Sequence, residues 1–167
     1  MTAVLSELDL GAQVNVRATK SPVRVSGPVE GVWGNREVPP GDLRRARRTV
    51  SALPGEPNTV LGDAIWLGPD EWLVLGAHEE DYPGAAAAVD VSANRVGFAL
   101  SGPGAADVLA QGCSLDLHAS AFPPGRCAQT LVARAQVILL RPDAETFHLL
   151  VRPSFAPYLR AWLEDAL

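Results

Sequence analysis

Residues 89–117 read VDVSANRVGFALSGPGAADVLAQGCSLDL, and this stretch decides the class of fold. Larger apolar residues alternate with small ones over residues 96–100, which is the period of a half-buried strand. A Ser-Gly-Pro turn then places Pro103 at the first expected helical position, and Gly112 stands just past the expected helix end. The stretch therefore predicts a strand, a tight turn and a short helix. It contains no nucleophile elbow, phosphate loop or metal-ligand pattern.

Short apolar runs separated by turn residues continue on both sides of this stretch. They predict strands in the region 23–33 and at 64–67, 71–75, 128–133, 136–140 and 146–151. Pro69 lies between the second and third of these strands and predicts a hairpin turn. Helices are predicted at 43–53, with Asp42 as the cap, at the alanine run 85–88, and from Ser154 to the end.

These elements predict an α+β fold of two small, mostly antiparallel sheet-and-helix subdomains. We expect residues 1–88 to form an N-terminal subdomain, with an irregular or extended leader over residues 1–20. Residues 89–167 are expected to form the C-terminal subdomain.

The composition limits the classes of function. The chain has 167 residues, of which 47% are hydrophobic, and a net charge of −5. An acidic protein of this kind is a poor binder of nucleic acid, which requires a basic surface. The arginines at 44, 45, 47 and 48 are interpreted as a solvated helix face, with an anion site as the alternative. No secretory signal, membrane-spanning run or cysteine framework is seen, so we expect a reducing cytoplasm.

Residues able to carry chemistry are few and scattered. His78, His118 and His148 are far apart, and His148 falls within a predicted strand. His118 is the better candidate for a functional histidine, because it lies in a predicted loop. Cys113 and Cys127 lack a neighbouring base and are expected to be buried structural residues. The sequence therefore predicts no catalytic residue and no metal site.

Five short motifs together resemble the gamma subunit of heterotetrameric sarcosine oxidase. They are WLGPDEWL at 66–73, DVS at 90–92, LSGP at 100–103, LDL at 115–117 and RPSF at 152–155. A wider similarity is to the aminomethyltransferase of the glycine cleavage system and related folate-binding proteins. Those carry Asp-Val-Ser-His, whereas Ala93 replaces the histidine here. The resemblance implies a ferredoxin-like or aminomethyltransferase-like (GcvT-like) fold.

The resemblance also implies a structural role in a heterotetramer that demethylates sarcosine oxidatively to glycine. Hydrogen peroxide forms, and the one-carbon unit passes to tetrahydrofolate. The partners would be the alpha, beta and delta subunits. FAD, FMN, NAD and the folate site would belong to the large subunits, and a zinc site to the smallest. We expect no cofactor in this chain, no nucleic acid and no membrane partner, and an exposed apolar patch that meets other subunits.

The alternative is a stand-alone folate- or pterin-binding protein. Such a site needs a carboxylate that can pair with the pterin ring inside an apolar pocket. Asp90 and Asp116 are the candidate residues, and each has turn or strand-end capping as its other interpretation. A small homo-oligomer with a scaffold role is also compatible with the sequence.

Overall fold

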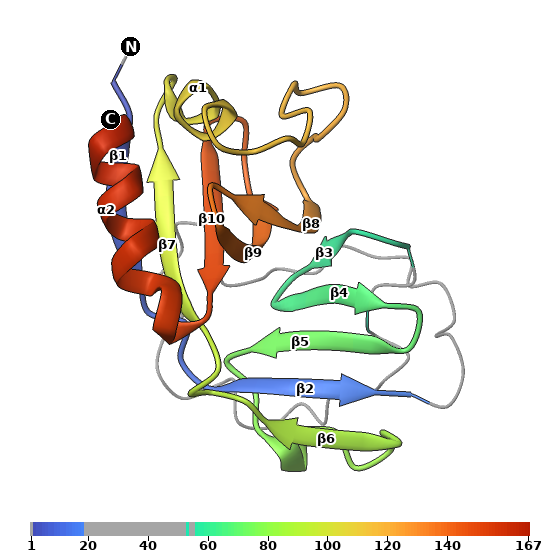
Figure 1. Cartoon of the computed structure of the whole chain (residues 1–167). Helices are drawn as coiled ribbons and strands as arrows, with labels where there is room; N and C mark the ends of the chain where they lie inside the picture. Colours follow the sequence, from blue (N-terminus) through green and yellow to red (C-terminus); the bar gives the residue numbers. More distant parts are fainter. Residues whose placement is uncertain (1, 19–52, 54–55) are drawn as a thin grey trace, which may run out of the picture. The chain divides into compact units, whose positions relative to one another are not determined.

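The computed structural model describes residues 2–18, 53 and 56–167 (Figure 1). The predicted strand in the region 23–33 and the arginines at 44–48 lie outside these residues. So does the predicted helix at 43–53, apart from its last residue, which is buried. The chain forms two compact units, residues 1–10 with 93–167 and residues 11–92.

The first unit is built on a five-stranded antiparallel sheet in the order β1-β7-β10-β9-β8. Its strands are β1 (Val4–Leu8), β7 (Val96–Ser101), β8 (Arg126–Val132), β9 (Ala135–Arg141) and β10 (Thr146–Val151). Its helices are α1 (Ala105–Ala110), the 3-10 turn η3 (Pro153–Phe155) and α2 (Ala156–Ala166). α2 lies along the sheet beside β1 and β7 (Figure 1).

Alternation along the strands makes the core of this unit. Phe147, Leu149 and Val151 of β10 share one face of the sheet, because successive strand residues point to opposite sides. They are fully buried in one cluster with Leu159 and Leu163 of α2. These two leucines are four residues apart, so they lie on the same side of the helix. Burying this stripe is the main apolar contribution to the stability of the unit.

The second unit is a five-stranded antiparallel sheet in the order β3-β4-β5-β2-β6. The strands are β2 (Gln13–Arg17), β3 (Val60–Leu61), β4 (Ala64–Gly68), β5 (Glu71–Leu75) and β6 (Ala87–Asp90), and η2 (Glu79–Asp81) is a 3-10 turn. Trp66 and Trp72 pair across the β4–β5 hairpin, and Trp72 is completely buried with Val14 and Val16 of β2.

The α+β class with mostly antiparallel sheets is confirmed. The helix predicted at the alanines 85–88 is wrong, because residues 87–90 form β6, which pairs with β2. Alanine favours helix only weakly, and the hydrogen bonds offered by the edge of β2 outweigh that preference. α1 begins at Ala105, two residues after the predicted start.

The ends of the units differ from the expected subdomain limits. β1 lies within the expected leader, yet it pairs with β7 in the second half of the chain. The junction between the units in the second half lies between Ser92 and Ala93, four residues after the expected boundary at Ala88. The first unit is therefore discontinuous in sequence, and residues 11–92 are inserted into it.

Candidate functional site

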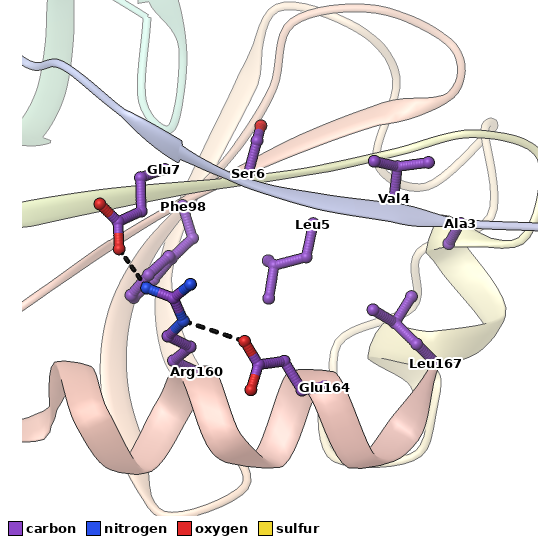
Figure 2. A pocket seen from close by; sticks show the side chains of 9 residues that line it. All are labelled: Ala3, Val4, Leu5, Ser6, Glu7, Phe98, Arg160, Glu164 and Leu167. Atoms are coloured by element: carbon purple, nitrogen blue, oxygen red, sulfur yellow. Dashed lines mark hydrogen bonds and ion pairs between the residues drawn. The ribbon is translucent and has the colours of Figure 1, made fainter.

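A groove of about 320 Å³ runs between β1 and α2 of the first unit (Figure 2). β1 contributes a continuous run of residues, from Ala3 to Glu7, to one side of it. Arg160, Glu164 and Leu167 contribute the other side, and Phe98 of β7 also lines it. The groove lies at the surface, since Val4 and Leu167 in its lining are exposed.

Strand and helix geometry brings these residues together. Glu7 lies directly opposite Phe98 in the register of β1 with β7, and Leu5 lies opposite Leu100. Arg160 and Glu164 are one helical turn apart and Leu167 follows three residues later, so the three point from one side of α2. Figure 2 shows Leu5 directed from β1 toward the helix, between these side chains.

An ion-pair network closes one end of the groove. The Arg160 guanidinium donates Nε to Glu164 Oε1 at 2.9 Å and also pairs through Nη1 with Glu7 Oε1. The hydrogen bond to Glu164 and the charge of Glu7 raise the pKa of Arg160. All three side chains are about half exposed or more, so the network adds little to stability. Its two carboxylates and one guanidinium leave a net charge of one negative at the rim.

This arrangement suits binding rather than bond-breaking. Leu5, Phe98 and Leu167 supply apolar surface. The Arg160 cation is already paired with both Glu7 and Glu164. No lining residue is a nucleophile with an adjacent base, which covalent catalysis requires.

Asp90 is located at the end of β6 and closes a turn. Its Oδ1 accepts hydrogen bonds from the Ser92 hydroxyl at 2.6 Å and the Ser92 backbone N–H at 2.8 Å. These two bonds lower the pKa of Asp90. Ser92 Oγ in turn accepts the backbone N–H of Gln13 at 2.9 Å. The Asp-Val-Ser motif therefore joins β6 to the start of β2.

Asp116 is also located in a turn, in the other unit. Its Oδ1 accepts the backbone N–H of His118 at 2.9 Å, and His118 Nδ1 lies 2.7 Å from Ser120 Oγ. Both side chains are exposed and bonded within their own loop. Neither Asp116 nor His118 lines the groove.

His148 of β10 and Arg141 of β9 are buried polar residues of the first unit. Burial lowers the pKa of His148 to about 4, so the imidazole is neutral near neutral pH. Arg141 donates Nη1 to the carbonyls of Leu117 and Phe122, at 2.9 and 2.8 Å, and its guanidinium stacks on Phe147. Arg141 thereby fixes the loop between α1 and β8 to the sheet.

The described residues contain no cluster of three or more histidine, cysteine or acidic side chains that could hold a metal ion. Cys113 and Cys127 are both buried, as expected, and neither forms a disulfide. Within the same part of the chain, no helix is long and apolar enough to cross a bilayer.

The groove could not be expected from the sequence, because residues 1–20 predict only an irregular or extended leader. The apolar residues Val4, Leu5 and Leu8 were the available signal for a strand. The i, i+4 spacing of Arg160 and Glu164 was the available signal for an ion pair on α2. β1 pairs with β7, whose residues lie 89 to 97 positions further along the chain, and no local sequence pattern indicates this pairing.

Comparisons with known proteins agree on one family. The model of the sarcosine oxidase gamma subunit family matches residues 55–167. Sarcosine oxidase subunit gamma of an Arthrobacter species is 32% identical over 178 residues, covering 98% of this chain and 79% of that protein. The subunit gamma of Corynebacterium sp. strain U-96 is 36% identical over 153 residues, covering 80% of this chain and 73% of the other.

A solved structure extends this similarity to the fold. One chain of the heterotetrameric sarcosine oxidase from Corynebacterium sp. U-96, in complex with pyrrole 2-carboxylate, superposes with a TM-score of 0.70. It is 27% identical, and the match covers 98% of this chain and 83% of that one. In both sequence and fold, the chain belongs to the sarcosine oxidase gamma subunit family.

Proposed function

We propose that this chain is the non-catalytic, structural gamma subunit of a heterotetrameric sarcosine oxidase. The observation that carries the proposal is similarity over 98% of this chain, in sequence to a sarcosine oxidase gamma subunit and in fold to one chain of a heterotetrameric sarcosine oxidase. The complex would demethylate sarcosine oxidatively to glycine and release hydrogen peroxide. The one-carbon unit would pass to tetrahydrofolate on the partner subunits.

The contacts of the ionisable residues support a structural role. Asp90 and Asp116 close turns, and Arg141 binds backbone carbonyls. Each of these three side chains therefore organises the local fold. Large apolar side chains are exposed on the first unit instead, as on surfaces that meet other proteins: Val4 at 58%, Phe155 at 44%, Tyr158 at 40% and Leu167 at 53%.

In this proposal the partners are the alpha, beta and delta subunits, and the flavin chemistry of the parent complex belongs to the large ones. FAD, FMN, NAD and tetrahydrofolate would bind there, in the cytoplasm. The described residues of this chain do not fit a pterin site, because Asp90 and Asp116 are exposed and engaged by their own turns. No reaction step is assigned to this chain.

Co-expression tests the proposal directly. An affinity-tagged chain, produced together with sarcosine oxidase alpha, beta and delta subunits from the same organism, is expected to retain flavin-bearing partners through purification. That complex should oxidise sarcosine and release hydrogen peroxide, whereas the chain alone should do neither. Sarcosine turnover by the isolated chain, or recovery without any partner, would overturn the proposal.

Calorimetry distinguishes the stand-alone folate-binding alternative, which these contacts do not favour. The isolated chain is expected to give no heat of binding with tetrahydrofolate at about millimolar concentration. The Asp90→Asn variant is the control, since a heat that this substitution removes would support the alternative.

A further inference from the structure

We propose that the open edge of β1 and the groove beside it bind an extended segment of another oxidase subunit. That segment would add a sixth strand to the sheet of the first unit. The inference rests on the proposed function and assigns a surface to it. Strand addition at an exposed sheet edge is an established way for one protein to recognise another.

The hydrogen-bond register defines which backbone groups of β1 are open. Gly102 donates its N–H to the Glu145 carbonyl at 3.0 Å, so residues 102, 100 and 98 direct their backbone groups toward β10. The backbone N–H and C=O groups of successive residues in an antiparallel strand point to opposite sides. Residues 97, 99 and 101 of β7 therefore direct these groups toward β1. Their opposite residues Leu8, Ser6 and Val4 complete those pairs.

Leu5 and Glu7 consequently direct their N–H and C=O groups away from β7. β1 is the last strand of its sheet. Among the hydrogen bonds of residues 2–18, 53 and 56–167, none uses these outward backbone groups. Two donors and two acceptors therefore remain in line, at the spacing that a further antiparallel or parallel strand requires.

The groove supplies selectivity for side chains of the added strand. Its apolar surface includes Leu5, Phe98 and Leu167, which suits an aliphatic or aromatic side chain. Exposed Val4 extends the apolar surface along the other face of the strand. Side chains of an added strand alternate between these two faces, so every second residue can enter the groove.

The charge at the rim identifies the partner's chemistry. Glu7 and Glu164 share a single guanidinium, that of Arg160, which leaves one negative charge uncompensated. A lysine or arginine near the apolar side chain would complement it. A second copy of this chain is a poorer occupant, because a two-fold pairing would place two acidic rims of a chain of net charge −5 together.

Residue-resolved hydrogen exchange on the assembled oxidase tests the inference. In the isolated chain, the amides of Ser6 and Leu8 should be protected and those of Leu5 and Glu7 should exchange freely. In the complex, the amides of Leu5 and Glu7 should slow by about tenfold or more, because they gain acceptors.

The outcomes separate this inference from the proposed function. A complex that forms while Leu5 and Glu7 still exchange freely overturns the edge proposal and leaves the structural role intact. Failure to form any complex overturns both. If the Leu5 and Glu7 amides of the isolated chain become more protected as the protein concentration rises, the β1 edge is assigned to a second copy of the chain. That result would also overturn the proposal.

Proline substitution isolates the backbone contribution. Glu7→Pro removes an outward N–H and should lower recovery of the partner by about tenfold, whereas Glu7→Ala removes only the side chain and should lower it by about threefold or less. Ala88→Pro removes an outward N–H from β6, the edge strand of the other sheet, and should leave recovery unchanged.

Equal recovery with Glu7→Pro and Glu7→Ala contradicts the proposal. Thermal unfolding shows whether each variant folds. If Glu7→Pro does not fold, the exchange rates of the Leu5 and Glu7 amides in the unmodified complex decide whether β1 receives an added strand.

Discussion

Single backbone positions explain motifs that the sequence shows only as patterns. Gly102, in the middle of the Leu-Ser-Gly-Pro motif, has a φ of +108°. A Cβ at this position would lie 2.5 Å from the carbonyl oxygen of Thr2. The glycine is needed both for its dihedral angle and for the approach of the segment that leads into β1.

Replacing this glycine should be costly. Gly102→Ala is expected to lower the free energy of unfolding by about 2–4 kcal/mol, from the strained φ and the clash together. Gly125→Ala is the matched control, since its φ is +84° and a Cβ there would contact nothing within 4 Å. That control should cost only about 1 kcal/mol, for the dihedral angle alone. Urea unfolding measures the free energy of unfolding of both variants. Equal losses in Gly102→Ala and Gly125→Ala would show that the close approach of Thr2 to Gly102 is unimportant.

Buried His148 should make stability depend on pH. The pKa of His148 is about 4 in the folded chain and about 6.5 when exposed, so the unfolded state binds the extra proton. Stability should therefore fall as the pH drops below about 6.5. Between about pH 7.5 and pH 5, His148 should account for a loss of about 2 kcal/mol. His148→Leu is expected to remove that part of the loss, and an unchanged pH profile in this variant would contradict the assignment.

At the scale of elements, strands specified by a local sequence pattern could be predicted, whereas strands specified by long-range pairing could not. The β4–β5 hairpin was predicted with its turn at Gly68–Asp70, because alternation and turn residues lie within a few positions. The alanine run 85–88 predicts a helix where β6 begins, and residues 1–20 predict only an irregular or extended leader where β1 forms. Both are edge strands whose structure depends on partners far along the chain, and the groove depends on β1.

Gly112 shows how a correct prediction can rest on a different cause. Its place after α1 indicated a helix stop, and the helix does end there. The structure adds a packing reason, since a Cβ at Gly112 would lie 2.6 Å from Cζ2 of Trp162 on α2. The glycine therefore allows α1 and α2 to approach.

A double-mutant cycle should detect this contact. Gly112→Ala is expected to cost about 1–3 kcal/mol through overpacking against the indole. In the Trp162→Leu background the same substitution should cost markedly less, because the ring is gone. Gly84→Ala serves as the control, because a Cβ at that position meets nothing within 4 Å. It should leave the free energy of unfolding nearly unchanged. Additive effects of Gly112→Ala and Trp162→Leu would argue against the contact.

At the scale of the whole molecule, the first unit is assembled from both ends of the chain. The sequence indicated two α+β subdomains, but no local pattern could indicate that residues 1–10 complete the sheet of residues 93–167. Ala3 and Leu167 line the same groove, so the two ends of this unit are close in space.

A rearranged fragment should demonstrate this completion. Residues 93–167, followed by a short flexible linker and residues 2–10, are expected to unfold cooperatively. Residues 93–167 alone should lose cooperativity, since the edge of β7 and the side chain of Phe98 become uncovered. A version with residues 2–10 in scrambled order is the control. Similar unfolding curves for the three polypeptides would contradict the assembly of β1 into this unit.

The link between Ser92 and Gln13 bears on the order of folding events. Ser92 Oγ accepts the N–H of Gln13 at 2.9 Å, and the Ser92 carbonyl accepts the Gln13 side chain at 3.2 Å. Once residues 11–92 have folded, these hydrogen bonds hold the first and last residues of that segment close together. β1 and β7 then meet across a few residues instead of a span of about eighty, which spares roughly 2 kcal/mol of chain-closure entropy. We therefore expect the first sheet to form faster when the second sheet is already in place.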